Sequence, residues 1–215
     1  IINFPWKRSM RWGEGNLRWV RPLKFVYCSL FNPDNSFEVI DLKLNEVNSV
    51  NFTFGHYLMS SNKIYPNSVS DYLQKLLENK VILDRDERKK IIIDASKNLL
   101  RDKQNTLLFD EELIEEIVGL IEWPVVFLGQ IDKEFLTLPK EILRVTMKEH
   151  QKFLSVLNEN SNLIDQFIVV ANMMAKDGGK AILDGNTRVL RSRLKDAKFF
   201  FENDLRFIKT EGISS

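Results

Sequence analysis

Hairpin-length turns between strand-like segments are the feature that most restricts the fold of this chain. The apolar runs 153–157 and 167–171 flank the polar segment 158–162, which suits a hairpin. An Asn-Pro-Asp-Asn turn signal likewise separates the strand-like runs 25–30 and 37–42. Several strands joined in this way, mixed with helices, predict an α+β fold with a mixed or antiparallel sheet, not a doubly wound parallel sheet.

Three amphipathic stretches predict a helical segment at about 68–122. Ser70 is expected to cap the first helix, and Asp84 followed by Glu87 resembles a capping box at the start of the second. Asp110 opens the third helix, with acidic residues in the first turn, where the helix dipole favours them. Apolar residues recur at helical spacing behind each cap, so the three helices are expected to form one layer.

Beyond these helices the pattern predicts a buried strand, a short helix and a long last helix. The strand is expected at 125–128, and Pro139 suits the first turn of the short helix. Asp184-Gly185-Asn186 is expected to cap the last helix, which runs to about Asp204. Its core-facing residues recur at helical spacing and are Leu190, Leu194, Ala197 and Phe201.

The length and composition of the chain fit a globular protein. Its 215 residues can bury a sizeable core, and 44% hydrophobic with 28% charged residues is unlike a disordered tail. We expect a single domain over 1–207 and the start of a linker at 208–215. The first residue is not methionine, so the sequence is expected to begin inside a longer chain. No apolar stretch approaches the ~20 residues that cross a bilayer, and the expected location is cytoplasmic.

No recognisable active-site motif occurs in the sequence. His56 and His150 do not belong to a ligand-spaced set, and Gly13-Glu14-Gly15 lacks the third glycine of the dinucleotide fingerprint. The single cysteine, Cys28, lies in an apolar run and is expected to be a small buried hydrophobe, not a catalytic thiol. We therefore expect no catalytic residue, no metal site and no cofactor site in this chain.

Two groups of basic residues are candidates for contacts with phosphate groups. In the first 24 residues, six Lys or Arg face one Glu, and three of the four tryptophans occur there. On the last helix, four cations at i, i+3, i+7 and i+10 share a face that differs from the apolar stripe. Structural alternatives exist for both groups, because arginine stems can cover tryptophan rings and the helix row can be a solvated face. The candidate contacts are Arg188, Arg191, Lys195 and Lys198 on the helix, and Lys7, Arg8 and Arg11 near the start.

Several short motifs occur in a fixed order along almost the whole chain. They include MRWG at 10–13, VGLIEWP at 118–124, MKEHQKF at 147–153, FIVVAN at 167–172, GNTRVLR at 185–191 and LKDAKFFF at 194–201. In this order they resemble the β subunit of the bacterial glycyl-tRNA synthetase (glycine–tRNA ligase). By this resemblance the chain is an N-terminal or central fragment, and the family's later domains are expected beyond Phe207.

The resemblance implies a holoenzyme of two α and two β subunits that attaches glycine to its tRNA with ATP and Mg²⁺. The α subunit would hold the aminoacylation site, so this chain is expected to contribute tRNA binding and subunit architecture, with the basic residues above as candidate tRNA contacts. It also implies a fold similar to the editing-type domain in the β subunit of phenylalanyl-tRNA synthetase. Two alternatives are an assembly scaffold that contacts the α subunit while other domains hold the tRNA, and hydrolytic editing by a pocket in the sheet.

Overall fold

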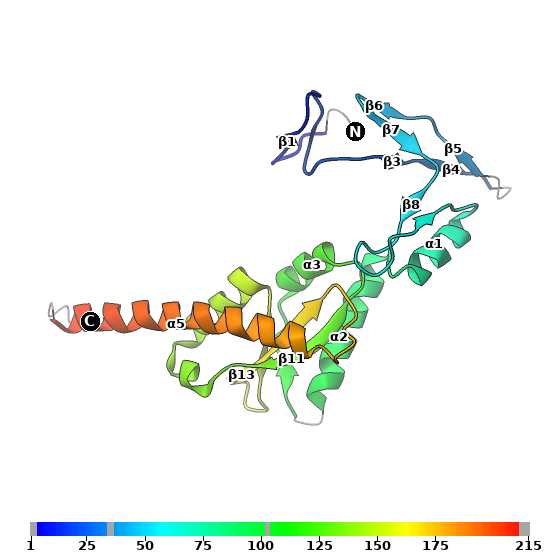
Figure 1. Cartoon of the computed structure of the whole chain (residues 1–215). Coiled ribbons are helices and arrows are strands. Elements are labelled where there is room, and N and C mark those ends of the chain that lie inside the picture. Colours follow the sequence, from blue (N-terminus) through cyan, green and yellow to red (C-terminus); the bar gives the residue numbers. More distant parts are fainter. Residues whose placement is uncertain (1–3, 34–36, 102–103, 211–215) are drawn as a thin grey trace. The chain divides into compact units, whose positions relative to one another are not determined.

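The computed structural model describes residues 4–33, 37–101 and 104–210 (Figure 1). For residues 209 and 210 it describes the backbone only. Contacts within the chain divide it into two compact units, Ile1–Leu83 (unit 1) and Asp84–Ser215 (unit 2). These two units are defined by contacts alone, which do not test where a domain of the family begins and ends. The single domain expected over 1–207 therefore stays a prediction. In the described ranges, no helix combines the length and the apolar composition needed to span a membrane.

Unit 1 consists of short paired strands and one helix. Its strands are β1 (Met10–Arg11), β2 (Arg18–Trp19), β3 (Val26–Tyr27), β4 (Ser29–Phe31), β5 (Phe37–Val39), β6 (Lys43–Leu44), β7 (Val47–Val50), β8 (Thr53–Phe54) and β9 (Lys63–Ile64). The pairs β1–β2, β4–β5, β6–β7 and β8–β9 are antiparallel, whereas β3 runs parallel to β7. The predicted first hairpin is confirmed as β4–β5, although residues 34–36 of its turn lie outside the described residues.

Helix α1 (Val69–Glu78) begins at a different cap from the expected one. The Ser68 hydroxyl accepts a hydrogen bond from the Asp71 amide at 3.1 Å, so Ser68 is the N-cap and Ser70 lies in the first turn. Ser70 was a wrong choice because the extended backbone of a cap residue occurs two positions earlier, at Ser68. The three helices predicted as a single layer are divided between the units: α1 belongs to unit 1, whereas the next two helices belong to unit 2 and share a core there.

Unit 2 is a four-stranded antiparallel sheet with helices on both faces (Figure 1). Its elements are α2 (Arg85–Leu100), β10 (Thr106–Leu107), α3 (Glu111–Leu120), β11 (Val125–Gln130), the 3-10 helix η2 (Lys133–Thr137), α4 (Lys140–Val145), the π-helical turn η3 (Thr146–His150), β12 (Leu154–Leu157), β13 (Leu163–Ala171) and α5 (Lys180–Thr210). The strand order is β10–β12–β13–β11. The predicted second hairpin is confirmed as β12–β13, and with it the α+β class with mixed and antiparallel sheets.

Alternation along β13 divides the core of unit 2 into two halves. Ile168 packs with Ile92 of α2 and Ile114 of α3. Phe167, one position earlier, points to the opposite face and packs with Leu190 of α5. The helices α4 and α5, with η2 and η3, therefore cover one face of the sheet and α2 with α3 covers the other.

The predicted caps of α2 and α3 are confirmed. Asp84 accepts hydrogen bonds from the amides of Asp86 and Glu87 at 2.7 and 3.1 Å. Asp110 accepts one from the amide of Leu113 at 3.1 Å. These carboxylates satisfy amides that have no partner within the helix, and they fix where each helix begins.

Helix α5 begins earlier and ends later than expected. Asp177 accepts hydrogen bonds from the amides of Gly179 and Ala181, at 3.0 and 2.8 Å, so it caps the helix. The cap expected at 184–186 is wrong, because the Asn186 side chain donates to the carbonyl of Ile182 one turn earlier in the same helix. The helix also continues through Thr210, past the linker expected to start at 208, and 211–215 lie outside the described residues.

Candidate functional site

The four predicted cations of α5 lie on one face of the helix, which we call the α5 row. Arg191 forms an ion pair with Asp132, with 2.7 Å between Nε and Oδ2. Lys198 pairs with Glu134 at 3.2 Å. Arg188 and Lys195 are exposed, and neither forms an ion pair within the described part of the chain. Two of the four charges are therefore neutralised by acids in and next to η2, and the other two remain available.

A shallow recess of about 440 Å³ adjoins the α5 row. It lies between the end of β11 and the first turns of α5, and its lining residues are Leu128, Gly129, Gln130, Leu183, Asp184, Thr187, Arg188 and Arg191. The guanidinium groups and the Thr187 hydroxyl can donate hydrogen bonds to an anion, while the Asp184 carboxylate opposes one. Thr187 and Gln130 could not be predicted from the sequence, because only the packing of α5 against β11 brings them together.

The cations near the start of the chain lie on the β1–β2 hairpin and the segment before it. Lys7, Arg8 and Arg11 are all exposed, and none has an ion-pair partner in residues 4–33, 37–101 or 104–210. Arg11 lies opposite Arg18 in the strand register, and the Arg18 Nε donates to the Ser9 hydroxyl at 3.3 Å. This hairpin therefore presents a locally positive surface that its own side chains do not neutralise.

The tryptophans beside these cations pack within unit 1. The ring centroids of Trp6 and Trp19 are 5.0 Å apart, and Trp12 packs against a small core that includes Leu17 and Leu44. All three tryptophans are half-buried. Trp12 and Trp19 therefore pack against apolar and aromatic neighbours, while the cations around them stay exposed.

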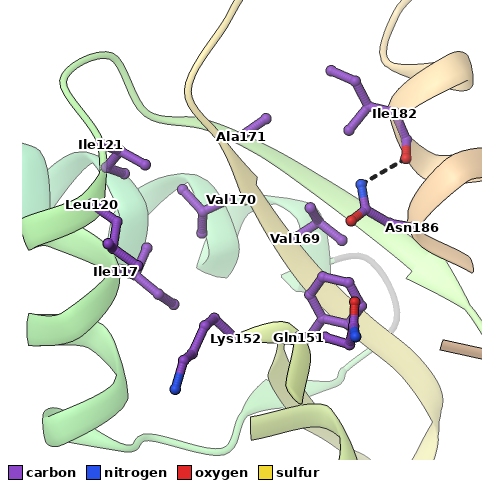
Figure 2. A pocket seen from close by; sticks show the side chains of 11 residues that line it. Ile117, Leu120, Ile121, Gln151, Lys152, Val169, Val170, Ala171, Ile182 and Asn186 are labelled. Atoms are coloured by element: carbon purple, nitrogen blue, oxygen red, sulfur yellow. Dashed lines mark hydrogen bonds between the residues drawn. The ribbon is translucent and has the colours of Figure 1, made fainter. Parts of the chain in front are cut away.

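A second recess, of about 170 Å³, opens between α3, β13 and the start of α5 (Figure 2). Its walls are mostly aliphatic, and Gln151, Lys152 and Asn186 are its polar side chains. The Lys152 ammonium pairs with Glu116 at 2.9 Å, and Asn186 donates to the Ile182 carbonyl at 2.8 Å. Its lining residues include no nucleophile beside a general base, the arrangement that covalent hydrolysis uses.

The strongest electrostatic feature of unit 2 is a set of ion pairs around α3. Lys89 of α2 contacts both Glu111 and Glu115, and these hydrogen bonds raise the pKa of its ammonium group. From the other side, Lys148 lies 3.0 Å from Asp110 and 3.2 Å from Glu112. The partners are far apart in sequence, so spacing alone could not predict the pairs. They join α3 to α2 and to η3, which is a structural role.

The two histidines and the cysteine do not form a reactive cluster. His56 is fully buried, and its Nδ1 accepts a hydrogen bond from the Leu58 amide at 3.2 Å, whereas His150 is exposed. Cys28 is half-buried, not buried as expected, because it lies between the short edge strands β3 and β4. Among the described residues, no three His, Cys, Asp or Glu side chains gather as metal ligands.

Comparison with known proteins places the whole chain in one family. The family model for the glycyl-tRNA synthetase beta subunit matches residues 1–210. The glycine–tRNA ligase beta subunit of Ruegeria sp. (strain TM1040) is 47% identical over 211 residues, which are 98% of this chain and 31% of that protein. Those of Paracoccus denitrificans and Cereibacter sphaeroides are 44% and 43% identical over 97% and 99% of the chain, and 30% of each of those proteins. The chain therefore spans about 30% of the length of these relatives. It belongs to the family of glycyl-tRNA synthetase beta subunits.

Proposed function

We propose that this chain is part of the β subunit of a glycine–tRNA ligase, which attaches glycine to its tRNA with ATP and Mg²⁺. The observation that carries the proposal is the family match over residues 1–210. In this proposal the aminoacylation site lies on an α subunit, in an assembly of two α and two β subunits located in the cytoplasm. This chain then contributes tRNA binding and subunit architecture.

The proposed tRNA contacts are made to the phosphate backbone by cations of α5 and of the β1–β2 hairpin. Phosphate contacts position a nucleic acid and supply affinity that does not depend on sequence. Arg188 and Lys195 are the first candidates on α5, because neither is ion-paired in the described part of the chain. Arg191 and Lys198 would have to exchange the carboxylates of Asp132 and Glu134 for phosphate oxygens, so their expected contribution is smaller.

The fold is further proposed to be similar to the editing-type domain in the β subunit of phenylalanyl-tRNA synthetase. The antiparallel sheet of unit 2 with helices on both faces is compatible with that likeness. The role proposed for it is architectural, since the recess beside β13 holds no nucleophile next to a general base.

An assembly scaffold that contacts the α subunit is the alternative function. It predicts an exposed apolar surface around the tryptophans of unit 1. Trp6, Trp12 and Trp19 are half-buried, and the exposed side chains beside them are of two kinds. Phe4, Met10 and Val20 are apolar, as a protein partner requires, whereas Lys7, Arg8 and Arg11 are cations, as an anionic partner such as tRNA requires.

Reversing one charge of the α5 row is expected to weaken tRNA binding. Lys195→Glu, or Arg188→Glu, should reduce the affinity for glycine tRNA and for an unrelated tRNA alike, by about three- to tenfold each. The slope of log affinity against log salt should fall by about one, because one phosphate contact is lost. Fluorescence anisotropy of labelled tRNA across a salt series measures both quantities.

Arg193→Glu is the matched control for this experiment. Arg193 is exposed on the same helix and carries the same charge, but lies two residues from Lys195 and hence on the opposite side. Its substitution should leave affinity and salt slope nearly unchanged. If all three variants bind tRNA like the parent chain, the α5 row is not a phosphate surface, and capture of the α subunit becomes the next assay.

A further inference from the structure

The apolar stripe of α5 continues beyond the core that it packs against. Its first members, Leu190 and Leu194, are fully buried beneath η2 and η3. Phe201 is half-buried at the edge of the same core. The next positions of the same face are Leu205 and Ile208, which are 41% and 47% exposed. Figure 1 shows this second half of the helix extending past the strands of unit 2.

One side chain at the margin of the continued stripe adds to its apolar character. Phe200 is 64% exposed, and its ring contacts that of Phe199, which points further round the helix, edge to face. A helix of a globular protein usually carries an apolar stripe only where another element covers it. The continuation of a buried stripe by exposed leucine, isoleucine and phenylalanine therefore indicates an interaction surface.

We propose that this surface, made of Phe200, Phe201, Leu205 and Ile208, binds another part of the full-length β-subunit polypeptide. The relatives are about three times as long as this chain, which spans 30–31% of their length, so the full-length protein holds ample polypeptide to cover it. The inference rests on family membership and does not depend on the tRNA-binding proposal.

The size and charge of the surface favour an occupant from the same polypeptide. Stable contacts between separate proteins bury about 1,200–2,000 Å², more than a few side chains along three helical turns can supply. A contact within one chain needs less area, because the covalent link gives the two surfaces a high effective concentration. Glu202 and Asp204 lie among these residues, and their carboxylates would repel the phosphates of RNA.

The rate of thiol labelling at single cysteines tests the proposal in the full-length β subunit. Leu205→Cys probes the stripe, and Ser192→Cys is the control on the opposite, exposed side of α5, both in a background whose other cysteines, Cys28 included, are replaced by serine. We expect Leu205→Cys to react at least about tenfold more slowly than Ser192→Cys, after each rate is normalised to the unfolded protein. Ile208→Cys should be similarly protected, and it replaces Leu205→Cys if that variant fails to fold.

Several outcomes of this measurement would overturn the proposal. Equal labelling rates at positions 205 and 192 would mean that nothing covers the stripe. Protection that disappears when the β subunit is diluted would assign the surface to a second copy. Protection that appears only after the α subunit is added would assign it to that subunit. Slow labelling of the stripe in diluted β subunit alone is the result that supports the proposal.

Discussion

Replacing Phe167 by alanine is expected to lower the free energy of unfolding of unit 2 by about 4 kcal/mol. The Phe167 side chain is fully buried between β13 and α5. Its ring lies 4.9 Å from that of Phe153, in a stacked arrangement. The substitution removes this apolar area and leaves a cavity in a close-packed core, and both effects destabilise the fold. Urea denaturation followed by circular dichroism measures the change.

The same ring explains why position 129 is glycine. Gly129 is the cross-strand partner of Phe167, and a Cβ atom built there would come within 2.4 Å of the Phe167 ring. Gly129→Ala alone should therefore cost about 2 kcal/mol through overpacking. Combined with Phe167→Ala it should cost much less, because the added methyl group then enters the space that the ring has left. The double variant is thus expected to be more stable than the sum of the two single effects predicts.

Gly185→Ala is the matched control for the close approach at Gly129. Gly185 lies inside α5, and no atom lies within 4 Å of a Cβ built there. Alanine should stabilise the helix at this position by about 0.5–1 kcal/mol, because glycine has the lower helix propensity. Strict additivity of Gly129→Ala and Phe167→Ala would show that the ring does not fix the glycine.

The elements that could be predicted from the sequence are those set by local chemistry. The sequence predicts the caps Asp84 and Asp110 because a carboxylate followed by an apolar helical repeat is a signal within a few residues. It predicts the β12–β13 hairpin because these strands are long enough to show a pattern around a polar turn. Apart from the β4–β5 hairpin, which a turn signal marks, the strands of unit 1 are two to four residues long and too short for alternation to appear. The β1–β2 pair also lies in a stretch dominated by charge.

The start of α5 was misplaced for a local reason as well. Asp177 precedes Gly178-Gly179, which suggests a turn, and only the structure shows that this turn leads directly into the helix. Asp184-Gly185-Asn186 has the composition of a cap but lies inside the helix. There the Asn186 side chain bonds back to the Ile182 carbonyl.

The candidate site was predictable in its geometry but not in its charge. Spacing along the helix was sufficient to place Arg188, Arg191, Lys195 and Lys198 on one face. Whether such cations can bind a phosphate depends on acidic side chains elsewhere in the chain. Asp132, the partner of Arg191, is 59 residues away in the sequence. Tertiary packing thus neutralises part of a row that the sequence alone presents as fully cationic.

Removing the carboxylate of Asp110 is expected to destabilise unit 2 in a pH-dependent way. This side chain is 11% exposed and accepts hydrogen bonds from the Leu113 amide, Lys148 and Arg144. Burial alone would raise the pKa of Asp110, but the hydrogen bonds from Lys148, the Leu113 amide and Arg144 outweigh it and lower the pKa below its ordinary value. Asp110→Ala should cost about 2 kcal/mol at neutral pH, from the lost cap and the lost ion pairs.

The sign of the pH dependence follows from the direction of this pKa shift. A carboxyl group with a lowered pKa in the folded state contributes stability that is complete above its unfolded-state value, near 4, and is lost as the pH falls through the folded-state value. The difference in the free energy of unfolding between the parent chain and Asp110→Ala should therefore be constant around neutral pH and become smaller in acid. Urea denaturation at each pH measures this difference.

Two further variants serve as controls for Asp110→Ala. Asp110→Asn keeps a cap, so it should cost about half as much at neutral pH. Asp184→Ala removes an exposed carboxylate from α5 and should change stability by less than about 0.5 kcal/mol. A difference between the parent chain and Asp110→Ala that stays the same from neutral pH into acid would mean that the charge of Asp110 does not stabilise the fold.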